Sequence, residues 1–356
     1  MAVDGIRREY LAWREAMLQR SARGELRASA AERETLERFV AALTSLSAES
    51  RREWERERAD LERDRGLCSC GHPHSHHDAA GSCFHVVGCA TGCSCVTRRF
   101  ERYVAIGDST SEGLDDPDGH GGYRGWANRL AERIAAQQDG LLYANLAVRG
   151  RTTRQIRDEQ LAASLAMNPD LATVVAGTND ALRRHFDAAG FMADLEAMQA
   201  ALIAQGAAVL TFTLPDLTPI MPFARVLGTR VDSLNESIRA ACSKSGAILC
   251  DLARYPIASD PRLWSDDRLH ANSLGHARIA DALAWHLGLP GTDMTWAEPL
   301  PPIPPPTILD LARAEVAWAR RHLLPWIWRH LNGRSSGDGR VAKRPELRAV
   351  RVADVK

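Results

Sequence analysis

Residues 103–109 read YVAIGDS, a short apolar run that ends in glycine, aspartate and serine. Four more apolar runs follow, and patterns with helical spacing separate them. Runs that are apolar at every position are typical of strands covered on both faces, and their alternation with helices predicts an α/β fold with a parallel sheet. The four runs are 141–146 (LLYANL), 171–177 (LATVVAG), 207–214 (AAVLTFTL) and 247–252 (AILCDL), and the helical patterns lie near 125–138, 153–166, 188–205, 229–245 and 273–287.

The composition excludes several classes of protein. The chain has 356 residues, of which 45% are apolar and 25% charged, as in soluble globular proteins. Its 45 Lys and Arg balance 45 Asp and Glu, which argues against polyanion binding by the whole chain. No apolar run approaches the roughly 20 residues that span a bilayer. Residues 1–17 carry charges where a signal peptide needs an apolar core, so we expect a cytoplasmic protein.

The chain divides into five predicted segments. A helical extension occupies residues 1–65, and a cysteine- and histidine-rich module occupies 66–98. The α/β domain covers 102–290. A proline-rich linker and an amphipathic, Trp-rich helix follow over 299–331, and residues 332–356 have the polar composition of a disordered tail.

Two of these segments have features that suit contacts with partners. The N-terminal extension carries alternating charges over 51–65, which is typical of an exposed connector helix, and a coiled-coil or protein-binding role is the alternative. We expect the C-terminal helix to pack its apolar face on the α/β domain. Its basic residues also suit an anionic membrane surface, so a peripheral membrane contact is the second interpretation. The apolar face consists of Trp318, Leu323, Trp326 and Ile327.

Polar residues follow the predicted strands where each strand ends. In parallel sheets these ends share one edge, which is where sites of this fold class lie. Ser109 directly follows the first strand, so its hydroxyl is a candidate nucleophile. Ser111 is a competing nucleophile, but it lies farther from the strand end, and it replaces the second glycine of the G-x-S-x-G elbow. By itself, the Gly-Asp-Ser tripeptide is equally typical of an ordinary turn.

Three further strand-end segments supply the groups that a serine nucleophile needs. Gly150 offers a backbone N–H and Asn179 a side-chain amide to a developing oxyanion, although each also suits an ordinary turn. Asp267 and His270 stand three residues apart before the last helix. This spacing lets the carboxylate hold one ring nitrogen while the other faces a nucleophile. A capping aspartate and a surface histidine are the plain alternative for this pair.

In this order, the four blocks resemble the SGNH, or GDSL-type, hydrolase family over residues 102–290. The resemblance implies a flavodoxin-like three-layer α/β/α sandwich and ester hydrolysis without a metal cofactor. It implies that Ser109 is the nucleophile, His270 the general base and Asp267 the residue that orients this base. The implied oxyanion hole consists of the backbone N–H groups of Ser109 and Gly150 and the side-chain amide of Asn179. The blocks are Gly107-Asp108-Ser109, Gly150, Gly177-Thr178-Asn179-Asp180 and Asp267-Arg268-Leu269-His270.

The expected activity is therefore hydrolysis of acyl esters through an acyl-enzyme. A serine hydroxyl becomes a strong nucleophile when a base takes its proton, and a histidine with an ordinary pKa of about 6.5 does so at neutral pH. The expected substrate is a small-molecule ester, and segment 215–228 is the expected apolar wall of its acyl pocket. Nucleic acid is not an expected partner, because the sequence has no clear basic–aromatic stripe.

Six of the eight cysteines lie between Cys68 and Cys95, which predicts a structural zinc site. The segment cannot fold by burial alone, so the metal would supply most of its stability. Free or disulfide-linked cysteines are the alternative. The segment resembles small Cys/His zinc-ribbon-like modules of the C-x-C-G-H type, and it holds more candidate ligands than one zinc needs. The preferred ligands are Cys70, His77, Cys83 and Cys93, with Cys68, His72 and Cys95 as substitutes.

Two other functions compete with a serine esterase. In the first, the zinc module recruits a partner and the hydrolase fold is an inactive scaffold. The complete set of five site residues argues against this function, since a decayed site would have lost at least one. In the second, the cysteine cluster is a catalytic zinc centre, but cysteine-rich sites are usually closed and structural. A serine esterase with an N-terminal helical and zinc-binding extension is the favoured hypothesis.

Overall fold

The α/β domain is described almost in full. The computed structural model describes residues 99–138, 140–183, 185–220, 228–303, 308–323, 325 and 336–350. The predicted helical extension (1–65) and zinc module (66–98), including every candidate zinc ligand, lie outside the described residues.

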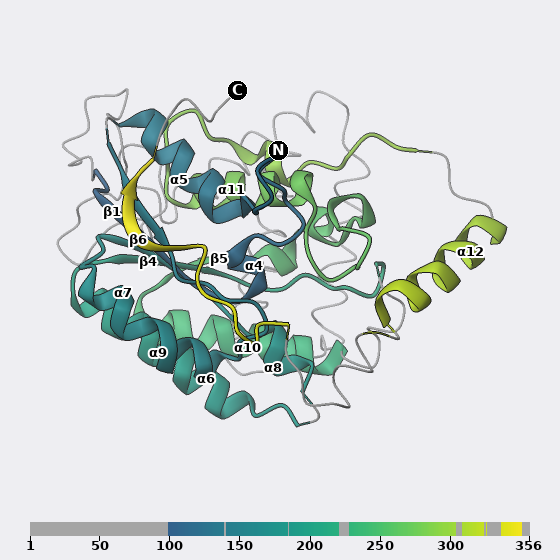
Figure 1. Ribbon diagram of the computed structural model, residues 1–356, viewed down its shortest axis with the longest axis horizontal. Helices are drawn as coiled ribbons and strands as arrows, with labels where there is room; N and C mark the ends of the chain where they lie inside the picture. The colour runs from purple at the N-terminus through teal and green to yellow at the C-terminus, as the bar shows by residue number, and fades with distance from the viewer. Residues whose placement is uncertain are drawn as a thin grey trace, which may run out of the picture. The chain divides into compact units, whose positions relative to one another are not determined.

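A six-stranded sheet in the order β5-β4-β3-β1-β2-β6 forms the centre of the domain (Figure 1). The first five strands along the chain pair in parallel and coincide with the five predicted apolar runs. β1 lies between β2 and β3, so the residues that follow these three strands meet at one edge of the sheet. The strands are β1 (Arg102–Gly107), β2 (Leu142–Asn145), β3 (Leu171–Val175), β4 (Ala208–Phe212), β5 (Ile248–Cys250) and β6 (Arg344–Ala349).

Helices cover both faces of the sheet, which confirms the three-layer α/β/α prediction (Figure 1). α5 (Gly125–Gln137) and α11 (Ser273–His286) pack on one face, and α9 (Ala188–Ala204) and α10 (Gly228–Ser245) pack on the other. The shorter elements are α4 (Ser109–Glu112), α6 (Thr153–Ile156), the π-helical turn η2 (Arg157–Leu161), α7 (Ala162–Ala166), α8 (Thr178–Ala181), the 3₁₀ turns η4 (Leu252–Arg254), η5 (Pro256–Ser259), η6 (Pro261–Leu263) and η7 (Met294–Ala297), α12 (Ile308–Trp318) and the π-helical turn η8 (Ala319–Leu323).

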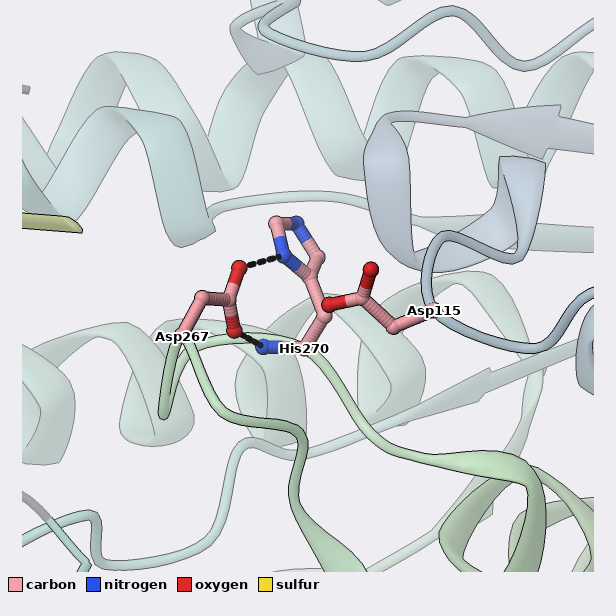
Figure 2. Close-up of side chains that lie close together, drawn as sticks. All are labelled: Asp115, Asp267 and His270. Atoms are coloured by element: carbon pink, nitrogen blue, oxygen red, sulfur yellow. Dashed lines mark hydrogen bonds and ion pairs between the residues drawn. The ribbon is translucent and has the colours of Figure 1, made fainter. Parts of the chain in front are cut away.

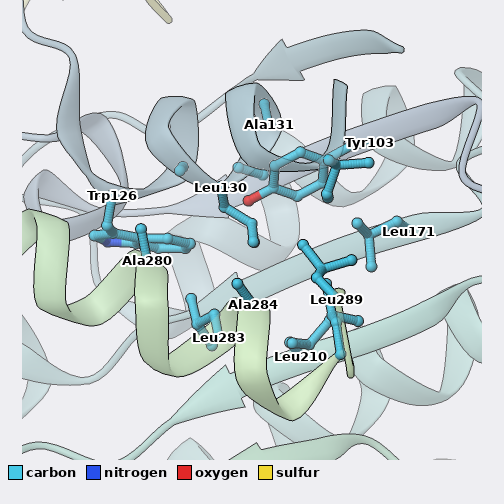
Figure 3. Close-up of a cluster of buried hydrophobic side chains, with 14 of the residues drawn as sticks. Tyr103, Trp126, Leu130, Ala131, Leu171, Leu210, Ala280, Leu283, Ala284 and Leu289 are labelled. Atoms are coloured by element: carbon cyan, nitrogen blue, oxygen red, sulfur yellow. The ribbon is translucent and has the colours of Figure 1, made fainter. Parts of the chain in front are cut away.

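Alternating residues of β1 divide the core into two halves. Tyr103 and Ala105 belong to the cluster formed with α5 and α11, whereas Val104 and Ile106 belong to the cluster formed with α9 and α10. All four side chains are fully buried. Figure 3 shows the first cluster, in which Trp126 of α5 lies beside the side chains of α11. Burial of a large apolar side chain contributes about 1.5–3 kcal/mol, so β1 is firmly held on both faces.

Residues 344–349 contradict the prediction of a disordered tail over 332–356. They form β6, which pairs antiparallel with β2 and extends the sheet. Lys343 fixes the approach to this strand, because its Nζ donates hydrogen bonds to the carbonyl oxygens of Tyr123 and Arg124 (2.9 and 2.8 Å). The prediction failed because it weighed side-chain polarity. β6 is instead held by backbone pairing at a sheet edge, where charged residues and proline are common.

Deletion of residues 344–356 should open the β2 edge. The amide hydrogen of Tyr143, which points towards its partner Arg348 in β6, should then exchange faster with deuterium because it loses its acceptor. The amides of Leu142 and Leu146 donate to carbonyl oxygens on the β1 side and serve as internal controls. Residue-resolved hydrogen–deuterium exchange measures all three. Unchanged exchange at Tyr143 would contradict the pairing.

Candidate active site

Ser109 stands at the start of α4, immediately after the central strand β1. Asp108 caps this short helix by accepting a hydrogen bond from the N–H of Thr110 (3.0 Å). Gly107 is required at the turn, because a Cβ there would lie 2.5 Å from the carbonyl oxygen of Val175 in β3. Ser109 is 7% exposed. The turn therefore places the serine at the sheet edge with little freedom to move.

Gln160 on the π-helical turn η2 clamps the same turn, and the sequence analysis did not identify it. Its side-chain amide donates to the carbonyl oxygen of Gly107 (2.9 Å) and accepts from the N–H of that glycine (2.8 Å). The backbone N–H and the backbone carbonyl of Gly107 thus both form hydrogen bonds with one buried side chain. π-helical turns are frequent near functional sites, but a single glutamine in a helical pattern gave no signal in the sequence.

The structure brings together three of the predicted site residues. His270 Nε2 lies 2.8 Å from Ser109 Oγ, and His270 Nδ1 lies 2.6 Å from Asp267 Oδ2. The second carboxylate oxygen of Asp267 accepts the backbone N–H groups of Leu269 and His270 at 2.9 and 3.0 Å (Figure 2). The carboxylate therefore fixes both the imidazole and the backbone that carries it. This is the chain of contacts that a serine nucleophile and its base require.

Asp267 and His270 each stabilise the charged form of the other. Burial alone would lower the pKa of His270, but the hydrogen bond and negative charge of Asp267, with the charges of Asp115 and Asp108, raise it above its usual value. Burial alone would raise the pKa of Asp267, but its contacts with His270 outweigh this and hold the pKa well below its usual range. Asp267 is thus an anion at neutral pH and stabilises a proton on the imidazole.

Asn179 and Gly150, the predicted oxyanion donors, lie on neighbouring segments beside Ser109. The Asn179 amide donates to Asp108 Oδ2 and to the carbonyl oxygen of Arg151, each at 3.1 Å. Both amide hydrogens thus have protein acceptors, and an oxyanion would have to share or replace one of them. Gly150 has φ of 76°, a left-handed backbone that favours glycine. The Asn179 amide is thus held between the turn that carries Ser109 and the segment that follows Gly150.

A buried ion pair, which the sequence analysis missed, ties α4 to the Gly150 segment. The guanidinium of Arg149 contacts the carboxylate of Glu112, with Nε 3.0 Å from both oxygens. The backbone N–H of Arg149 also donates to Glu112 Oε2 (2.8 Å). Both residues are less than one-tenth exposed. This pair therefore links the helix that begins with Ser109 to the turn that carries Gly150.

Ser111, the competing nucleophile, makes no hydrogen bond to a base in the described part of the chain. The residue is fully buried, and its Oγ has no hydrogen-bond partner among the described residues. A serine without a base or solvent access is a poor nucleophile.

Helix α12 contacts the loop that carries Asp267. The indole Nε1 of Trp318 donates to the carbonyl oxygen of Asp267 (3.1 Å). Arg268 lies 4.9 Å from the Trp318 ring centroid and forms an ion pair with Glu315 of α12 (2.7 Å). Trp318 thus contacts this loop. The side chains of Leu323, Trp326 and Ile327 lie outside the described residues, so the packing of the apolar face stays a prediction. None of the described helices is long and apolar enough to cross a membrane.

An apolar pocket adjoins His270. The pocket has a volume of about 820 Å³, which includes the solvent at its open mouth. Pro215 and Leu217 of the predicted wall segment 215–228 line it, and residues 221–227 lie outside the described ones. Other lining residues include Thr110, Thr178, Phe212, Leu214, Leu252, Ile257, Ala258, Leu263 and Trp296. Its lining is mostly apolar, as in sites that take small organic ligands.

One cluster among the described residues has the spacing of a cation site. Ligand atoms of Asp115, Asp267 and His270 lie within 4.8 Å of one another. Both ring nitrogens of His270 already contact Asp267 and Ser109. A cation in this cluster would have to replace one of these contacts.

Comparison with known proteins finds a family match within the α/β domain. Residues 105–278 match the GDSL-like Lipase/Acylhydrolase family. No curated protein matches the chain significantly. Similar solved structures include LAE5, an alpha/beta hydrolase enzyme from the metagenome of Lake Arreo, Spain (22% identity, TM-score 0.46, 53% of this chain and 95% of that chain). A second is the lipase/acylhydrolase from Enterococcus faecalis (21% identity, TM-score 0.45, 52% of this chain and 95% of that chain). A third is a catalytic mutant of Axe2, an acetylxylan esterase from Geobacillus stearothermophilus (16% identity, TM-score 0.44, 56% of this chain and 97% of that chain).

Glu112→Gln should destabilise the protein by about 3–5 kcal/mol, because it leaves the buried Arg149 guanidinium without its counter-charge. Glu159→Gln is the matched control. It breaks the more exposed ion pair with Arg151 and should cost less than about 1 kcal/mol. Chemical denaturation measures both free energies of unfolding. Equal, small effects of the two substitutions would show that the buried pair does not hold α4.

Proposed function

We propose that the GDSL-like lipase/acylhydrolase domain of residues 105–278 is a serine esterase that hydrolyses carboxylic esters through an acyl-enzyme. Ser109 is the nucleophile, His270 the general base and Asp267 the residue that orients it. The observation that carries the proposal is the unbroken chain of contacts from Ser109 Oγ to His270 Nε2 and from His270 Nδ1 to Asp267 Oδ2.

The first half of the reaction forms the acyl-enzyme. Ser109 Oγ attacks the ester carbonyl carbon as its proton moves to His270 Nε2, and Asp267 stabilises the imidazolium that results. The tetrahedral intermediate collapses when His270 gives this proton to the leaving alcohol oxygen. The C–O bond to the alcohol breaks, and the acyl group stays on Ser109.

The second half of the reaction repeats this chemistry with water. His270 takes a proton from a water molecule, and the hydroxyl oxygen attacks the acyl carbon. When the tetrahedral intermediate collapses, Ser109 Oγ leaves with the proton of His270, and the carboxylic acid departs. Every proton in the cycle passes through the same imidazole nitrogen.

Negative charge develops on the carbonyl oxygen in both halves. The proposed donors to this oxygen are the backbone N–H groups of Ser109 and Gly150 and the amide of Asn179. Donors that are fixed before the reaction stabilise such charge most effectively, since they need no reorganisation. Hydrogen bonds to Asp108 and Arg151 hold the Asn179 amide near Ser109, and the oxyanion would share or replace one of them.

The apolar pocket supports an acyl group as its occupant. It is bounded by Thr110, Thr178 and His270, which adjoin or belong to the proposed catalytic set, and most of its other lining residues are aliphatic or aromatic. An alkyl chain gains about 0.8 kcal/mol for each CH₂ that it buries. The proposed substrates are therefore esters with an extended aliphatic acyl chain.

Ser109→Ala should abolish hydrolysis of p-nitrophenyl esters and labelling by a fluorophosphonate probe, which needs an activated serine. Asn179→Ala should lower kcat about a hundred- to a thousandfold, the usual effect of losing one oxyanion donor. Ser111→Ala is the control and should keep its activity. Full labelling of the Ser109→Ala protein would refute the assignment. An unlabelled, inactive wild-type protein would favour the alternative, an inactive scaffold that serves a recruitment role.

Ala258→Phe should shift the acyl preference towards short chains, because the added ring fills the pocket. We expect kcat/KM for p-nitrophenyl octanoate to fall roughly tenfold or more, with little change for the acetate. A series of p-nitrophenyl esters from acetate to decanoate measures the preference. Ala163→Phe, on the exposed side of α7, is the size-matched control. An unchanged chain-length profile would place the acyl group elsewhere.

A further inference from the structure

Asp115 lies beside the proposed catalytic pair but makes no direct hydrogen bond to His270. It belongs to the loop after α4, whereas Asp267 and His270 belong to the segment before α11 (Figure 2). Its backbone has φ of 65°, a left-handed conformation that is uncommon for residues other than glycine. Such conformations cost about 1–3 kcal/mol and cluster at functional sites.

Ser265 connects Asp115 to Asp267. Its hydroxyl oxygen lies 2.6 Å from Asp115 Oδ2 and 2.7 Å from Asp267 Oδ1. Its backbone N–H donates to the carbonyl oxygen of His270 (2.9 Å), so Ser265 also closes the loop that carries the imidazole. A hydroxyl has one proton, and it can donate to one carboxylate at a time. The bridge therefore holds two negative groups close together with a single shared donor.

We propose, on the basis of the function above, that Asp115 is a positioning residue for the catalytic pair. Through Ser265 it fixes the carboxylate of Asp267, and it adds a second negative charge within 4.8 Å of the His270 imidazole. The two carboxylates together, rather than Asp267 alone, orient the His270 imidazole and place negative charge beside it.

The contribution of Asp115 to the pKa of His270 can be separated from those of the other titratable groups nearby. Four titratable groups face the imidazole: Asp267 from its own loop, Asp115 from the loop after α4, Asp108 at the start of α4 and His276 from α11. Burial lowers the pKa of His276 to about 4, so this residue is neutral where the enzyme would work. Burial raises the pKa of Asp108 to about 6.

The two carboxylates repel each other, and a proton on His270 relieves this repulsion. Asp115 therefore stabilises the imidazolium more than the neutral imidazole. The imidazolium is the state that forms as Ser109 attacks, so the effect of Asp115 falls on the transition state. It also raises the pKa of His270, and removal of its charge lowers that pKa.

Asp115→Asn tests the proposal, because asparagine keeps the shape and tolerates the left-handed backbone. The imidazole of His270, followed by NMR in a pH titration without substrate, should titrate at lower pH than in the wild-type protein. The acid limb of kcat/KM for a p-nitrophenyl ester should move in the same direction, and kcat should fall about tenfold, within the range for residues of one hydrogen-bond network. Asp115→Gly, which also suits the left-handed backbone, should give the same shifts.

Asp118→Asn is the matched control. Asp118 is an exposed residue of the same loop, and its carboxylate accepts the N–H groups of His120 and Gly122. This substitution should leave the His270 titration and kcat unchanged. Ser265→Ala should lower kcat, and combining it with Asp115→Asn should cost less than the sum of the single effects, since both remove one bridge.

The outcomes separate this proposal from the proposed esterase function. A His270 titration that is the same in the Asp115→Asn, Asp115→Gly and wild-type proteins would overturn the role of Asp115, even if the enzyme hydrolyses esters. Equal shifts in the Asp118→Asn protein would also overturn it. A wild-type protein without esterase activity would instead refute the proposed function, and the titration would still report whether Asp115 acts on His270.

Discussion

The hydrogen bond between Ser109 and His270 joins residues that stand 161 positions apart, and the candidate site depends on this contact. Each end is held by a different part of the fold. Ser109 follows a strand that is buried on both faces, and the Gln160 side chain clamps the glycine before it. His270 lies in a short loop closed by Ser265, directly before the Asn272 cap of α11. The sheet and α11 thus set the distance between nucleophile and base before any substrate binds.

The sequence was sufficient to predict the α/β fold, and it singled out three residues that the structure brings into contact. Strands buried on both faces must be apolar throughout, so all five parallel strands were visible as apolar runs. Such strands end at one edge, which places Ser109 there, and the segment before α11 brings Asp267 and His270 to the same edge. The three side chains meet there.

The supporting contacts were not predictable in the same way. Glu112 and Arg149 are 37 positions apart, and Asp115 and Ser265 are 150 apart. The sequence contains no periodic pattern or short motif that marks either pair, since charged and polar residues in loops usually lie on solvated surfaces. The edge strand β6 was missed because its side chains are mostly polar, whereas backbone pairing and a few side-chain contacts hold it. The zinc module and the N-terminal extension lie outside the described residues, so their predicted roles stay predictions.

The place of β6 in the chain has a consequence for biosynthesis. It comes after all the other described strands, yet it pairs with β2, the second of the described strands along the chain. Until residues 344–349 are translated, the nascent domain carries an open row of backbone donors and acceptors along β2. Such an edge is a template for pairing between neighbouring chains. A stalled or prematurely terminated polypeptide would therefore be prone to aggregate through the very surface that the completed protein protects.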